Sequence, residues 1–141
     1  MNIPLNFTCC LCHDCPKAGS CLRHLAAEEW SARDSSFACI NPKFRNVGTK
    51  DCIHFISTEK QRCAKGMKNI FDNLPLRAYK NIKNVLCSHF SRKRFYAMLK
   101  GESLIKPKEQ EYIASIFRSE GVEEPPVFEE YVEEYNWNNT D

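Results

Sequence analysis

The sequence lacks a long apolar run, and it lacks the features of a secretory leader. A helix that crosses a membrane needs about 20 consecutive, mostly apolar residues, and no stretch of this chain comes near that length. The start, MNIPLNFTCC, has neither the basic stretch nor the apolar core of a signal peptide. We therefore expect a cytoplasmic protein without a membrane partner.

Catalytic motifs are also missing. The chain contains no H-E-x-x-H, no phosphate-binding G-x-x-x-x-G-K-S/T, no G-x-S-x-G and no H-x-E followed by P-C-x-x-C. It has no internal repeat and no low-complexity segment, and its 141 residues suffice for one domain of ordinary size. These absences predict a protein without catalytic residues.

Cysteine, by contrast, is abundant, with nine residues in the chain. An odd count without an export signal argues against a disulfide framework, and a reducing cytoplasm leaves metal binding as the usual reason to cluster thiols. Five of the nine lie between Cys9 and Cys21. We therefore predict that this segment binds a metal.

The spacing in CCLCHDCPKAGSC supports this prediction. Two residues between cysteines, as in Cys9 with Cys12 and Cys12 with Cys15, let both sulfurs turn towards one ion, and a cysteine from a following helix can complete a tetrahedral shell. The preferred ligands are Cys10, Cys15, Cys21 and Cys52, with Cys12 as the strongest substitute. His13, His24 and His54 are weaker candidates, because a lone histidine is more often a surface residue than a ligand.

A single structural zinc ion fits this spacing best. A C-x2-C-x2-C run near a proline is also typical of [4Fe–4S] ligation, but Pro16 follows the third cysteine rather than the last, and a second set of cysteines is missing. A third interpretation treats Cys12 and Cys15 as a redox pair, which needs a strand before it and a helix after it, and only the helix is expected. The remaining Cys39, Cys63 and Cys87 are interpreted as small buried apolar groups.

Prolines and apolar spacing predict the elements of the first half. A helix should run from Cys15-Pro16 to about Trp30, because proline suits the first helical position. Two brief strands are expected over 37–40 and 53–56 in a region of loops. Thr58 and Gln61 form a capping box, which predicts a helix with an apolar face. That face would consist of Cys63, Met67, Ile70, Phe71 and Leu74.

The second half is predicted to be helical throughout. Pro75 should open a helix over 76–90, Ser91 should cap a short helix that ends at Gly101, and Pro107 should open a third that closes at Gly121. A last amphipathic helix is expected over 128–135. The predicted fold class is mainly α, with a cysteine metal knuckle over 1–57 and a helical bundle over 58–141, little or no β structure, and one compact domain overall.

The net charge of +2 conceals a strong polarity along the chain. Residues 65–108 carry 11 basic and 2 acidic side chains, whereas residues 109–141 carry 1 basic and 10 acidic. A basic middle attracts DNA or an acidic protein partner, and an acidic carboxyl-terminal helix can fold back over it.

The stretch 88–121 resembles the helix-turn-helix of phage-repressor-type regulators. A serine-capped short helix carries the aromatic anchor Phe95, ends at lysine-glycine and is followed by a proline-led helix. The resemblance implies a recognition helix in the major groove of DNA, although the preceding helix is longer than usual and its turn lacks glycine. The candidate DNA-contacting residues are Ser91, Arg92, Lys93, Arg94, Tyr96, Lys100, Lys106 and Lys108.

Two further patterns span nearly the whole chain. C-x4-C-P-x-A-x2-C-L-R starts at Cys10, and F-x2-Y-x3-Y-x-W starts at Phe128. Together they resemble a family of small, uncharacterised, cysteine-rich bacterial proteins, a resemblance that implies no activity.

From these observations we predict a zinc-stabilised DNA-binding or regulatory module. Two alternatives stay open: a protein-interaction adaptor that binds no nucleic acid, and an iron–sulfur redox or sensor protein.

Overall fold

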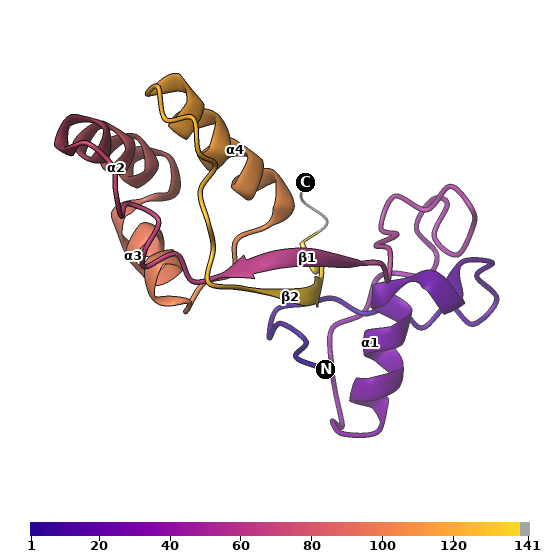
Figure 1. Ribbon diagram of the computed structural model, residues 1–141. Coiled ribbons are helices and arrows are strands. Elements are labelled where there is room, and N and C mark those ends of the chain that lie inside the picture. Colours follow the sequence, from indigo (N-terminus) through magenta and orange to yellow (C-terminus); the bar gives the residue numbers. More distant parts are fainter. Residues whose placement is uncertain (139–141) are drawn as a thin grey trace. The chain divides into compact units, whose positions relative to one another are not determined.

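A computed structural model describes residues 1–138 (Figure 1). The chain divides into two compact units. The amino-terminal unit comprises Met1–Lys60 and the residues from Tyr135 onward, and the helical unit comprises Gln61–Glu134. No helix among residues 1–138 has the length and apolarity that a membrane span requires.

The amino-terminal unit contains a short 3-10 helix, η1 (Ala18–Ser20), and one α-helix, α1 (Leu22–Ser31). The expected helix start at Pro16 is therefore wrong. Cys21 has an extended backbone and bridges to Ser57, which separates η1 from α1. The buried face of α1 packs into a small core of Phe7, Cys9, Leu22, Ala26, Ala27 and Ile56.

The two brief strands expected over 37–40 and 53–56 do not form. In their place, single bridges join Cys9 to Cys39 and Cys21 to Ser57. The turns between these positions satisfy many of their backbone groups locally, as when the Cys52 N–H donates to the Thr49 oxygen at 3.2 Å. The sequence pattern thus indicated extended backbone near Cys39 and Ser57, but the pairing there is a single bridge rather than a strand.

The helical unit starts with a strand, so the helix predicted behind Thr58 is wrong. Strand β1 (Lys60–Lys65) pairs with β2 (Glu130–Tyr135), and Ala64 exchanges both backbone hydrogen bonds with Ile105 at 2.9 Å. These partners are distant in sequence, and a local capping pattern carries no information about them. The apolar residues expected on that helix still contribute to the core, since Met67 and Ile70 are buried in it.

The three middle helices are confirmed. They are α2 (Leu76–Phe90), α3 (Arg92–Lys100) and α4 (Pro107–Ser119), and Figure 1 shows them close together at one end of the helical unit. Ser91 Oγ accepts a hydrogen bond from the Arg94 N–H, and Gly101 ends α3 with a φ of 82°. Their shared core is built from Ile82, Leu86, Phe90, Phe95, Met98, Ile113 and Phe117, among others.

The carboxyl-terminal helix expected over 128–135 is wrong, because this segment forms β2. Phe128 is buried, and the Glu129 N–H donates to the Gly66 oxygen at 3.0 Å. The Arg62 guanidinium lies over the Tyr131 ring, 3.9 Å from its centroid, so the two strands also meet through their side chains. The fold is therefore helix-rich, as predicted, but it includes a small two-stranded sheet.

Candidate metal centre and nucleic-acid interface

A small apolar cavity in the amino-terminal unit is lined by all four preferred cysteines, Cys10, Cys15, Cys21 and Cys52. The space open to a water-sized particle is about 20 Å³, which is room for one such particle. Its other walls include His24, His54, Phe55 and Val47. Cys10 and Cys52 are more than forty residues apart in the sequence, and the fold brings both to the same cavity.

Backbone hydrogen bonds hold three of these cysteines in position. The Cys10 N–H donates to the Arg23 oxygen at 3.1 Å, which ties the segment around Cys10 to α1. Cys21 lies where the Leu22 N–H donates to the Ile56 oxygen at 2.8 Å, and Cys52 follows a tight turn from Thr49. The cavity is thus assembled from the segment around Cys10, the start of α1 and the loop that precedes residue 57.

Arg23 is the side chain that joins these segments. Its Nε donates to the His54 oxygen at 2.8 Å, and its Nη1 donates to the Thr8 oxygen at 2.6 Å. The guanidinium also lies 5.1 Å from the centroid of the Phe7 ring. Sequence reasoning missed this residue, because nothing local indicates which carbonyl groups an arginine will reach.

Cys12, the substitute ligand, lies beside the cavity. Its sulfur is 3.6 Å from the position that a Cβ on Gly48 would occupy, and Gly48 lines the cavity. Burial, followed by a hydrogen bond with Cys10 and the nearby thiols of Cys10, Cys15 and Cys52, raises the pKa of Cys12 to about 11. This thiol therefore faces a group of other thiols.

His24 carries an unsatisfied buried nitrogen at the same cavity. Its Nε2 lies 3.3 Å from Oε1 of Glu28, one turn along α1. Among the residues that the structure describes, its Nδ1 is the one buried side-chain nitrogen or oxygen without a hydrogen-bond partner. Such an atom is costly unless a ligand or water satisfies it, and a carboxylate on the other ring nitrogen is the usual companion of a metal-bound histidine.

As the side chains stand, no three His, Cys, Asp or Glu residues within 1–138 come together in a group that could hold a metal ion. The ligand roles of the five cysteines therefore stay predictions. For the remaining cysteines, Cys63 is buried as expected and Cys87 is half-buried, but Cys39 is exposed, so its interpretation as a buried group is wrong. Cys39 lies beside Cys9, which is fully buried.

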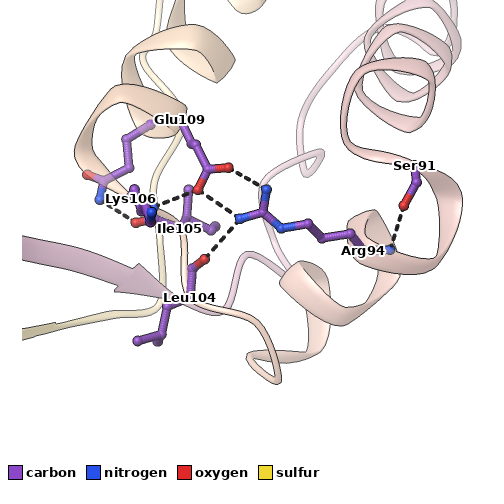
Figure 2. A network of polar contacts seen from close by, with 7 residues as sticks. Ser91, Arg94, Leu104, Ile105, Lys106 and Glu109 are labelled. Carbon is purple, nitrogen blue, oxygen red and sulfur yellow. Dashed lines mark hydrogen bonds and ion pairs between the residues drawn. The ribbon is translucent and has the colours of Figure 1, made fainter. Parts of the chain in front are cut away.

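Arg94, a predicted DNA contact, is part of a polar network in the helical unit (Figure 2). Its Nη2 donates to Glu109 Oε1 at 2.8 Å, its Nη1 donates to the other carboxylate oxygen, and the Lys106 N–H donates to Oε1 at 3.0 Å. Burial raises the pKa of the Glu109 carboxyl, but the hydrogen bonds and charges of Arg94 and Lys106 outweigh it, so the pKa lies below its usual value. The network joins α3 to the first turn of α4.

The other predicted DNA contacts are distributed over the surface. Arg92 and Tyr96 line a cleft of about 410 Å³ between α2 and α3. Ser91 is used as the helix cap, and it has a φ of 75°, which is rare for a side chain other than glycine. Arg92, Lys93, Lys100 and Lys108 are exposed, while Lys106 is half-buried.

The fold and the cavity together define a helix-rich protein with a cysteine-lined site. The chain belongs to a family of unknown function, DUF6078, whose model matches residues 1–137. The expected membership of an uncharacterised family is thereby confirmed. Comparison with curated proteins and with solved structures gives no match.

Replacing Arg23 with methionine should destabilise the amino-terminal unit by about 2 kcal/mol, because the carbonyls of Thr8 and His54 lose charged donors. Both tryptophans of the chain, Trp30 and Trp137, pack in this unit, so tryptophan fluorescence during urea unfolding measures its stability alone. Arg33→Met is the control, since Arg33 makes only an exposed i,i+4 pair with Glu29, and it should cost less than about 0.5 kcal/mol. Equal effects of the two substitutions would contradict the role given to Arg23.

Replacing Glu109 with glutamine should destabilise the helical unit by about 1–2 kcal/mol at neutral pH. Because the folded carboxyl has a lowered pKa, its contribution is present above the unfolded pKa of about 4.3 and is lost as the pH falls through the folded value. The difference in the free energy of unfolding between the wild type and the variant should therefore vanish in acid. Helical circular dichroism during urea unfolding at several pH values checks this, with the exposed Glu111→Gln as control; a gap that is independent of pH would refute it.

Proposed function

We propose that the protein is a zinc-stabilised DNA-binding or regulatory module. The observation that carries the zinc part is the convergence of Cys10, Cys15, Cys21 and Cys52 on one cavity. Zinc–sulfur bonds are about 2.3 Å long, and a cysteine side chain can swing its sulfur by rotation about one bond. The proposal therefore requires that side-chain rotation bring the four thiols, which line one small cavity, to a common ion.

The unsatisfied Nδ1 of His24 gives independent support for a ligand in this cavity. Zinc accepts imidazole nitrogen as readily as thiolate, so His24 can replace one of the four cysteines. Glu28 would then hold the ring in the required tautomer. A zinc ion bound by these residues would join the knuckle, α1 and the loop at Cys52.

The DNA-binding part rests on the charge of the helical unit. Residues 76–100, which form α2, Ser91 and α3, contain seven lysine or arginine residues and no aspartate or glutamate. Such a surface attracts phosphate groups by releasing counterions. The likeness of 88–121 to a helix-turn-helix adds to this proposal, although one residue, Ser91, joins α2 to α3, where that motif has a turn of three or four residues.

Protein purified without oxygen should contain about one zinc ion per chain and should be colourless. Cys10→Ser and Cys52→Ser should each lower the zinc content, because each removes one of the four preferred ligands, and a substitute such as Cys12 or His24 would have to complete the tetrahedral shell. Cys87→Ser, a cysteine of the helical unit, should keep it. Elemental analysis with an absorption spectrum measures both properties. Iron with inorganic sulfide would show an iron–sulfur cluster in place of zinc. The absence of both zinc and iron would overturn the zinc proposal.

Binding to double-stranded DNA should weaken steeply with salt. The double variant Arg92→Ala with Lys93→Ala should reduce the slope of log K against log salt by about 2, since each lost phosphate contact removes roughly 0.9. The charge-matched control is Lys43→Ala with Arg45→Ala, which removes two exposed cations from the amino-terminal unit. An adaptor that recognises only an acidic protein would bind no DNA under any salt condition.

A further inference from the structure

The cleft between α2 and α3 combines cationic and aromatic side chains. Its α2 wall presents Tyr79, Lys80, Lys83 and Asn84, and its α3 wall presents Arg92 and Tyr96. Cys87 of α2 also lines the cleft, and of the lining residues only Arg92 and Tyr96 were predicted to contact DNA. The cleft is concave and holds about 410 Å³, a volume in the range of small-ligand sites.

Lys83 lies between the two tyrosine rings. Its Nζ is 5.6 Å from the centroid of the Tyr79 ring and 5.7 Å from that of Tyr96, and it lies 3.5 Å from the Tyr79 hydroxyl. The Arg92 guanidinium lies 5.9 Å from the Tyr96 ring centroid. Hydrogen bonds with Tyr96 and Tyr79 raise the pKa of Lys83 above its usual value.

The surroundings of this cleft favour an anion. Neither α2 nor α3 contains an acidic residue. Two carboxylates at the ends of α4 reach these helices: Glu109 is engaged with Arg94 on α3, and Glu120 accepts a hydrogen bond from Asn81 on α2 at 3.2 Å. The positive charges of Lys80, Lys83 and Arg92 are therefore available to a ligand that brings its own negative charge.

We propose that this cleft binds a nucleotide of a single-stranded nucleic acid. A phosphate lies against Lys80, Lys83 and Arg92, and the base stacks on Tyr79 or Tyr96. A positively charged groove with aromatic stacking platforms is the usual chemistry of single-strand binding. This inference rests on the proposed DNA-binding function and deepens it by naming the state of the strand.

A duplex fits the cleft less well than a single strand. Bases in a duplex are stacked and present only their edges, whereas a recess with tyrosine walls accepts the face of an unstacked base. One of the side chains predicted to contact the major groove is also engaged elsewhere, because the Arg94 guanidinium donates to Glu109 and to the Leu104 oxygen within the unit (Figure 2).

The test compares a fluorescently labelled mixed-sequence single strand with its own duplex, by anisotropy at several salt concentrations. The full-length wild type should bind the single strand more tightly than the duplex. Tyr96→Leu, which keeps apolar bulk but removes the ring, should weaken single-strand binding roughly tenfold and leave duplex binding almost unchanged. Because the contacts are to phosphate and base faces, DNA and RNA strands should bind within a few-fold of each other.

Lys83→Gln provides a second variant, because the loss of one half-buried ammonium group that faces the cleft should not unfold the unit. It should reduce the salt slope for the single strand by about 0.7, and Lys68→Gln, an exposed lysine outside the two helices, should not. Duplex binding as tight as single-strand binding, or an unaffected Tyr96→Leu, would overturn the inference while the DNA-binding proposal stands. Binding of neither form would overturn both and leave the zinc proposal to its own test.

Discussion

The side chain of Arg23 bonds to backbone oxygens that lie 15 and 31 residues away along the chain, and its own carbonyl accepts from Cys10. The amino-terminal unit depends on such links, because its buried core consists of only six residues, two of them alanines. Partly buried side chains, among them Trp30, Phe37 and Trp137, pack against this core. Small units with few buried residues are commonly stabilised further by a metal or by disulfides. The cysteine cavity lies where the segments joined by Arg23 meet, which is where an additional link would stabilise the unit most.

In the helical unit a second arginine has a similar structural role. Arg94 joins α3 to the start of α4 through Glu109, and Glu109 also satisfies the Lys106 N–H at the helix terminus. This use of Arg94 removes one cation from the basic surface of α2 and α3 and leaves the others at its rim and in its cleft. The same packing that fixes the helices therefore also decides which of their charges stay unpaired by Glu109.

The accuracy of the sequence predictions depended on whether the stabilising contacts were local. Helices α2, α3 and α4 were predicted well, because Pro75, Ser91, Gly101 and Pro107 act within one or two residues of the boundaries that they set. The capping box at Thr58 and the amphipathic pattern over 128–135 were misleading. Both segments form strands instead, because β1 and β2 pair with each other and β1 also bonds to Ile105, and tertiary pairing overrides local propensity.

The sequence by itself determined the candidate ligands, since the crowding of cysteines around Cys10–Cys21 and the addition of Cys52 named the four residues that line one cavity. It also determined the basic character of the middle of the chain. Only the tertiary structure decided that Arg23 joins the segments of the cavity, that His24 holds an unsatisfied nitrogen there, and that Lys83 lies between Tyr79 and Tyr96. The physical reason is that residue type and spacing report on contacts along one helix or turn, whereas these arrangements arise where separate segments pack, and packing depends on the whole chain.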